Sequence, residues 1–148
     1  MGNLKLTSSA FEDGGEIPRE CGYKNGNQVP HLSVNGDVLD GIKSLTIIMD
    51  DPDAMGAVGK VWVHWLAWNI SATKPFHSGM HDGEGMTDFG EVGYGGPAPP
   101  DKRHTYVFKL YALDCKLRID VESTKAELEK AMEGHIIEQT QLTGTYTP

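Results

Sequence analysis

Cysteine is scarce in this chain, and no long apolar segment is present. The 148 residues contain two cysteines, Cys21 and Cys115, which are too few and too far apart for a disulfide framework or a zinc knuckle. No stretch approaches the roughly 18 apolar residues of a membrane span, and residues 1–6 lack the apolar core of a secretory signal. We therefore expect a cytoplasmic protein without a membrane span, while one long-range disulfide between the two cysteines stays open.

Positive charge is also scarce. Thirteen basic residues against 21 acidic ones give a formal net charge of −8, and the densest basic pair is Lys102-Arg103. Nucleic acids and anionic membrane surfaces both bind to basic faces, so both partners are disfavoured. A local positive pocket remains compatible with this composition, because net charge describes the distant field and not a single site.

Glycine and proline, by contrast, are abundant. The 18 glycines and 8 prolines exceed the usual combined share of about 12%, which indicates many turns and argues against a helical bundle. At roughly 100–200 residues per domain, we expect residues 1–148 to form one domain. The composition favours a mainly β fold, a β-rich α+β protein, in which residues 77–100 form a loop of the length usually associated with function.

Several segments carry the apolar, β-branched pattern of strands. The three strongest are Ser44–Met49, Val61–Ile70 and His104–Leu113. Shorter strands are expected at His31–Val34 and Leu142–Tyr146. Pro52 follows the first strong segment and ends its ladder, because proline has no N–H to donate.

The segment Val61–Ile70 is expected to be a central strand, because both of its faces are apolar. Strand alternation assigns four side chains to one face: Trp62, His64, Leu66 and Trp68. One helix is predicted after it, near the C-terminus. Thr124 and Glu127 form its capping box, and it runs to about Met132. Residues His135–Thr140 are expected to add a further helical turn or two.

Polar side chains collect on and just after the predicted strands. Asp51 and Asp53 follow the first strand, His64 lies within the second, and His104 and Tyr106 share one face of the third. If these strands are neighbours, the five side chains converge on one site. The remaining histidines lack a consistent partner spacing and are interpreted as surface or loop residues: His31, His77, His81 and His135.

Four motifs, in this order, resemble those of one family. They are Asp51-Pro52-Asp53-Ala54, Trp62-Val63-His64-Trp65, Gly93-Tyr94-Gly95-Gly96-Pro97-Ala98-Pro99-Pro100 and the strand from His104 to Asp114. Together they look like the phosphatidylethanolamine-binding protein family, which includes the Raf kinase inhibitor proteins of animals. The resemblance covers nearly the whole chain, and the compact length is similar to that of the bacterial and archaeal branch.

The resemblance implies both a fold and a pocket. The fold would be a large antiparallel sheet packed on a smaller one, with a few helices near the C-terminus. The pocket would accept a small anion such as phosphate, a phosphate monoester or acetate. The residues that match the family's pocket are Asp51, His64, Gly96, Pro97, His104 and Tyr106, with Asp53 as a supporting hydrogen-bonding residue.

The chemistry of an oxyanion explains why these residue types suit such a pocket. The imidazoles and the Tyr106 hydroxyl can donate hydrogen bonds, and the N–H groups of Gly95 and Gly96 can approach closely because no Cβ intervenes. Asp51 would repel a bare phosphate. Its presence makes sense if it holds one histidine protonated, or if it accepts the ammonium of a head group.

Two positions depart from the family's pattern. Met55 stands where the family often has proline, and Thr105 follows His104 where the family often has arginine. A charge that helps to hold the pocket wall is then missing or supplied differently. The departure bears on ligand affinity more than on the fold.

The function expected from these observations is non-enzymatic binding of phosphate or a phosphorylated head group, without a cofactor. Regulation of a kinase or a peptidase by binding is its natural extension, and a homodimer stays open. The alternative is a small hydrolase or phosphoryl-handling enzyme with His64 or His104 as general base, although no nucleophile accompanies either. Asp51 and the two histidines would also make a two-histidine, one-carboxylate metal set, but no short ligand spacing supports it.

Overall fold

A computed structural model of the chain describes residues 4–35, 41–71 and 83–148. The strands, in chain order, are β1 (Lys5–Thr7), β2 (Gly15–Glu16), β3 (Ser33–Asn35), β4 (Ser44–Asp51), β5 (Trp62–Ile70), β6 (Gly83–Glu84), β7 (His104–Leu113) and β8 (Ile136–Tyr146). The helices are α1 (Ala54–Val58) and α2 (Lys125–Met132), with a 3₁₀ turn at Arg19–Cys21. The predictions for His77 and His81 lie outside the described residues.

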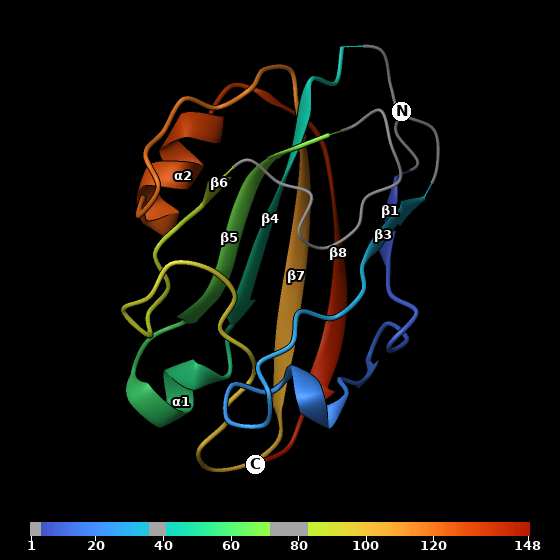
Figure 1. The fold of residues 1–148 in the computed structure, drawn as a ribbon, viewed down its shortest axis with the longest axis vertical. Helices are drawn as coiled ribbons and strands as arrows, with labels where there is room; N and C mark the ends of the chain where they lie inside the picture. Colours follow the sequence, from blue (N-terminus) through green and yellow to red (C-terminus); the bar gives the residue numbers. More distant parts are fainter. Residues whose placement is uncertain (1–3, 36–40, 72–82) are drawn as a thin grey trace.

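The mainly β fold is confirmed. Six strands form one sheet in the order β2-β8-β7-β4-β5-β6, and β1 pairs with β3 in a second, two-stranded sheet (Figure 1). The long strands are antiparallel, and β2 alone in the described sheet runs parallel to its neighbour, β8. The large sheet is therefore antiparallel in its main part, as expected.

Apolar side chains cover both faces of the large sheet. On one face, Leu6 of the small sheet and Phe11 of the following loop join a core with Phe108 of β7. On the other face, Leu128 of α2 packs with Leu66 of β5. Burying these side chains stabilises the fold at roughly 25 cal/mol per Å² of apolar surface, so the small sheet and α2 are both held by the large sheet.

The predicted strands match the observed ones closely, and the main error lies near the C-terminus. β7 has the predicted bounds, and β4 continues two residues beyond its predicted end. The helical turn predicted for His135–Thr140 is wrong, because β8 begins at Ile136 and pairs with β7 along most of its length. Tertiary pairing of this β-branched segment outweighs its weak helical pattern.

The helices also differ in part from the expectation. The capped helix near the C-terminus is present as α2. The short α1 was not predicted: it lies between β4 and β5, directly after Pro52. The strand expected at His31–Val34 is found slightly later, as β3.

A bulge in β5 changes which way its side chains point. Trp65 of β5 lies opposite Met49 of β4. The next pair along the ladder joins Val63 to Asp50, which leaves His64 as one extra residue on β5. Such a bulge interrupts the strict alternation of a strand. The side chains before and after His64 therefore do not follow the simple two-residue period.

The face predicted for Trp62, His64, Leu66 and Trp68 is consequently wrong. Leu66 and Trp68 belong to the core on the α2 side. The His64 ring instead packs against Tyr106, which belongs to the core on the opposite face. The strand is buried on both faces as predicted, but it lies near the sheet edge, since its outer partner β6 has only two residues.

The structure also shows the state of the two cysteines and the length of the helices. Cys21 and Cys115 are both free thiols, so the long-range disulfide is not formed. Among the described residues, no helix has the length and apolar character needed to cross a membrane.

The α2 cap gives a first stability test. The Thr124 side chain accepts from the Glu127 N–H, and the Glu127 carboxylate accepts from the Thr124 N–H. Replacing Thr124→Ala removes the first bond and should lower the free energy of unfolding by about 1 kcal/mol in urea denaturation. The exposed Glu129→Ala on the same helix is the control, expected within about 0.5 kcal/mol of the parent. Equal losses in both variants would contradict a capping role.

Candidate functional site

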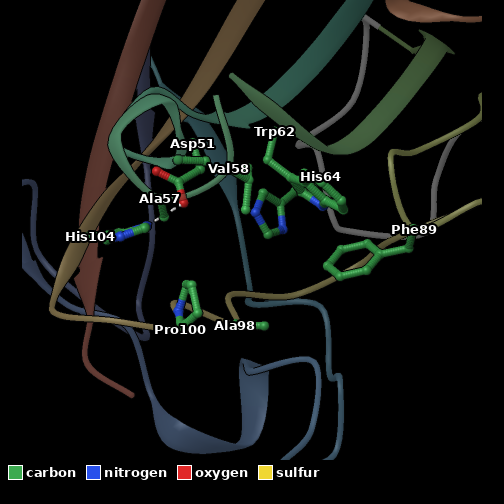
Figure 2. A pocket seen from close by; sticks show the side chains of 10 residues that line it. Asp51, Ala57, Val58, Trp62, His64, Phe89, Ala98, Pro100 and His104 are labelled. Carbon is green, nitrogen blue, oxygen red and sulfur yellow. Dashed lines mark hydrogen bonds and ion pairs between the residues drawn. The ribbon is translucent and has the colours of Figure 1, made fainter. Parts of the chain in front are cut away.

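A small cavity of about 150 Å³ lies at the end of the large sheet where β4 ends and β7 begins (Figure 2). Its wall consists of Asp51, Ala54, Ala57, Val58, Trp62, His64, Phe89, Ala98, Pro100 and His104. Seven of these side chains are apolar or aromatic, and three are titratable. The volume is below the roughly 300 Å³ of typical drug-sized pockets.

Strand order brings the three titratable side chains together. β4 lies between β5 and β7 and is antiparallel to both. Asp51 is the last residue of β4, and His104 is the first residue of β7, so antiparallel pairing places them at the same end of the sheet. His64 reaches the same cavity from β5 because of the bulge. Figure 2 shows the three side chains around one cavity.

His104 is held between two carboxylates. Its Nδ1 lies 2.6 Å from Asp51 Oδ2, and its Nε2 lies 2.7 Å from Asp101 Oδ1. Burial by itself lowers the pKa of the His104 imidazole, but the hydrogen bonds and charges of Asp51 and Asp101 outweigh it and raise the pKa above its ordinary value. Both ring nitrogens donate only in the imidazolium form. His104 is therefore the protonated histidine of the site, and both of its N–H groups are occupied.

His64 has the opposite character. Its Nδ1 lies 2.7 Å from the carbonyl oxygen of Gly95. Burial lowers the pKa of His64 below its ordinary value, and this outweighs the opposing influence of the Gly95 carbonyl and the Asp51 charge. A neutral ring that donates from Nδ1 has an acceptor at Nε2. His64 therefore offers the cavity a lone pair and not a proton.

Tyr106 packs against the rings of both histidines but is not one of the residues that line the cavity. Its ring centroid is 5.1 Å from that of His64 and 6.4 Å from that of His104. The side chain is fully buried. Its hydroxyl lies near the Asp51 carboxylate and the Ala98 backbone, but it makes no hydrogen bond of ordinary geometry with a described residue. Burial and the nearby Asp51 charge raise the pKa of Tyr106 far above its ordinary value, so it stays a proton donor. Trp62 has a second such buried donor, its Nε1–H.

Asp53 acts on the site through the backbone. Its carboxylate accepts from the N–H of Thr105 at 2.8 Å, and its own N–H donates to Asp51 Oδ1 at 2.9 Å. These bonds join the end of β4 to the start of β7. Asp53 therefore supports this corner through hydrogen bonds, while its part in ligand binding stays a prediction. Thr105, at the position where arginine was expected, contributes its backbone and not a charge.

The predicted glycine cradle is wrong, because both of its N–H groups already have protein acceptors. Gly95 donates to the carbonyl of His64, and Gly96 donates to Asn27 Oδ1. Pro97 does not line the cavity, and its carbonyl accepts from the N–H of Tyr23. Glycine is needed at these positions instead because neighbouring atoms leave no room for a side chain. A Cβ on Gly96 would overlap the carbonyl oxygen of Cys21.

The structure also adds and removes candidates. Asp101 was missed, although its position three residues before His104 was a possible signal. Phe89 was missed too, because no pattern in its loop points to a cavity.

Asp51, His64 and His104 do not form a group of three close donor atoms in the described part of the chain, and both nitrogens of His104 are engaged. The metal interpretation of this pocket is therefore not supported.

Comparison with known proteins identifies the relatives of this chain. The family model described as "Phosphatidylethanolamine-binding protein" matches residues 7–147. A UPF0098 protein of Chlamydia trachomatis is 39% identical over 97% of this chain and 98% of that protein. The UPF0098 protein PH1269 of Pyrococcus horikoshii is 40% identical over 97% of this chain and 76% of that protein.

Solved structures agree with these relationships. The phosphatidylethanolamine-binding protein homologue CT736 of Chlamydia trachomatis has a TM-score of 0.88 at 36% identity, covering 99% of this chain and 98% of that one. YbcL of E. coli, described as a new member of the mammalian PEBP family, has a TM-score of 0.85 at 30% identity, covering 97% of each chain.

The opposite characters of the two histidines can be measured by NMR titration. We expect the pKa of His104 to lie above 6.5 and that of His64 below it, for the reasons given above. Replacing Asp51→Asn should lower the pKa of His104, whereas Asp114→Asn, which removes a carboxylate bonded to His135, should not. A His104 that titrates at or below His64 would contradict the assignment.

The same shift predicts a pH dependence of stability. The folded pKa of His104 is raised, so its pairing stabilises the protein fully at pH below the ordinary value of 6.5. This contribution is lost as the pH rises through the folded pKa. Urea denaturation at several pH values should show that Asp51→Asn weakens this dependence, and an unchanged profile would argue against the pairing.

The glycine packing gives a further prediction. Gly96→Ala should cost more than about 2 kcal/mol of unfolding free energy, because the new methyl group meets a fixed backbone carbonyl. Gly56→Ala in α1 is the matched control. No atom lies within 4 Å of its Cβ position, so it should be neutral or stabilising by up to about 1 kcal/mol. Thermal unfolding that ranks the two variants equally would refute the packing argument.

Proposed function

The chain belongs to the phosphatidylethanolamine-binding protein family, and on this premise we propose that it binds a phosphate monoester in the pocket without transforming it. The family fold supports a binding role in general. The observation that carries the finer proposal is the buried hydroxyl of Tyr106, which makes no hydrogen bond of ordinary geometry with a described residue although Asp51 and Ala98 lie nearby. Buried polar groups in native proteins are nearly always hydrogen-bonded, so such a donor, packed against two histidines of the cavity wall, supports a ligand acceptor.

The charges around the cavity favour a monoanion over a dianion. Asp51, Asp101 and the His104 imidazolium together have a net charge of −1, which opposes a second negative charge nearby. A singly protonated phosphate monoester avoids this repulsion. Its O–H can donate to Nε2 of the neutral His64, while its other oxygens accept from Tyr106 and Trp62.

The same residual negative charge favours a ligand that also carries an ammonium group. The Asp101 side chain is half-exposed, so it can accept from an ammonium at the cavity mouth. The rings of Trp62 and Phe89 line the wall and would add cation–π attraction. A cavity of about 150 Å³ has room for such a head group, but not for the acyl chains of a lipid. Phosphoethanolamine is the ligand that satisfies these conditions.

The wall of the pocket argues for binding and against hydrolysis. The described wall contains no serine, threonine, cysteine or lysine, and its one carboxylate is paired with His104. A general base without a positioned nucleophile or metal is insufficient for the hydrolase considered above. Reproducible turnover of a chromogenic phosphate ester that is lost in His104→Ala would favour the enzyme instead.

The location and partners follow from the same proposal. The two free thiols suit a reducing, cytoplasmic compartment. Regulation of a kinase or a peptidase would act through a phosphorylated or acidic segment of that partner, which would enter the pocket.

Calorimetry with phosphoethanolamine on two matched tyrosine variants tests the proposal. Tyr106→Phe keeps the ring and removes only the hydroxyl, so it should weaken binding about tenfold, the worth of one hydrogen bond to a charged group, without lowering the melting temperature. Tyr111→Phe, on the same strand but in the α2-side layer, should bind like the parent. Equal affinity in all three proteins, or none in the parent, would overturn the proposal.

The pH profile of binding provides an independent check. Because His64 is neutral before binding, it must accept a proton or hydrogen bond from the ligand, so affinity should fall as the pH rises above the neutral range. A flat profile between mildly acid and mildly alkaline pH would contradict the role of His64.

Phosphoglycerol, which lacks the ammonium, should bind more weakly than phosphoethanolamine.

A further inference from the structure

A second group of donor atoms lies at the far end of β7. Asp114, Cys115 and His135 each place one carboxylate, thiol or imidazole atom within 4.8 Å of the other two. The pocket lies at the beginning of β7, and this group follows its last residue or comes from the segment before β8. Ten residues of strand correspond to about 30 Å. The group is thus separate from the pocket.

Strand ends and a helix end hold the three residues in place. The N–H of Asp114 donates to the carbonyl of His135 at 3.0 Å, which joins the end of β7 to the start of β8. The buried Ser44 hydroxyl donates to the carbonyl of Cys115 at 2.6 Å. His135 donates from its own N–H to Met132, the last residue of α2. The three side chains are therefore presented by backbone that the fold already holds rigid.

Contacts between side chains complete the arrangement. His135 Nδ1 lies 2.7 Å from Asp114 Oδ1. The Asp114 and His135 side chains are about half-exposed, and Cys115 is partly buried, so solvent ions can reach the group. This contrasts with Cys21, whose thiol is in the core.

We propose that Asp114, Cys115 and His135 bind one divalent metal ion of the zinc type. A thiolate, an imidazole and a carboxylate are the donors that Zn²⁺ takes, whereas Mg²⁺ and Ca²⁺ prefer oxygen ligands alone. Three protein ligands leave a fourth position for water. The thiol proton leaves to solvent on binding, and the two anionic ligands then balance the charge of the ion.

The set differs from a patch of acidic side chains in the variety and the closeness of its donor atoms. Its three donors are of three different types, and within the described residues it is the one group of three that comes this close. Asp114 and Cys115 are adjacent in sequence, but His135 comes from 20 residues further along the chain. A site on two separate elements exists only in the folded protein, so metal binding should stabilise the fold.

Titration with Co²⁺, a coloured substitute for Zn²⁺, tests the site in the intact protein. We expect one equivalent of Co²⁺ to produce a thiolate-to-cobalt charge-transfer band, which excess Zn²⁺ abolishes. Cys115→Ser should lose the band, and His135→Ala should weaken Co²⁺ binding. His31→Ala, which changes another exposed histidine, should leave both unchanged. Absence of the band in the parent, or its persistence in Cys115→Ser, would overturn the proposal.

Alkylation of the thiol provides a second measurement that needs no variant. Cys21 is buried, so iodoacetamide should modify Cys115 first in the folded protein. Zn²⁺ should slow this reaction several-fold, while the same concentration of Mg²⁺ should not. Equal protection by both ions, or by neither, would count against a site with a sulfur ligand.

Discussion

A buried imidazolium between two carboxylates is the interaction on which the rest of the pocket depends. A charged ring removed from water is costly unless both of its N–H groups are paired. Asp51 and Asp101 supply those partners for His104, and Asp53 ties the same corner to the backbone of β7. The end of β4 is thereby joined to the start of β7, and α1 follows directly from this corner to build part of the wall.

The neutrality of His64 is the counterpart of the charge on His104. One histidine is hydrogen-bonded to two carboxylates and keeps its proton, whereas the other is hydrogen-bonded to backbone and its burial outweighs the nearby carboxylate charges. The cavity wall therefore has an acceptor on His64 and a donor on Trp62, and the Tyr106 donor packs behind the two histidines. This division of roles suits a ligand that both donates and accepts, which is why we favour a protonated phosphate monoester over a bare dianion.

The sequence allowed most of the fold and part of the site to be predicted. Long apolar strands such as His104–Leu113 were placed well because strand burial leaves a strong pattern. The β8 segment near Ile136 was misassigned because its pairing with β7 is a tertiary effect. The bulge at His64 leaves no trace in the alternation of β5. The role expected for the Gly95 and Gly96 N–H groups failed because their acceptors come from distant parts of the chain.

The amino-acid pattern alone determined the β-rich class, the family, and the residue types gathered at the strand ends, because apolar periodicity and ordered motifs are local properties of the chain. Only the tertiary structure decided which histidine is charged, since a pKa depends on neighbours that the chain brings from afar. It also decided that the Tyr106 hydroxyl makes no hydrogen bond of ordinary geometry within the described residues and that Asp114, Cys115 and His135 meet. These features arise from burial and contact between separated segments, which no local pattern records.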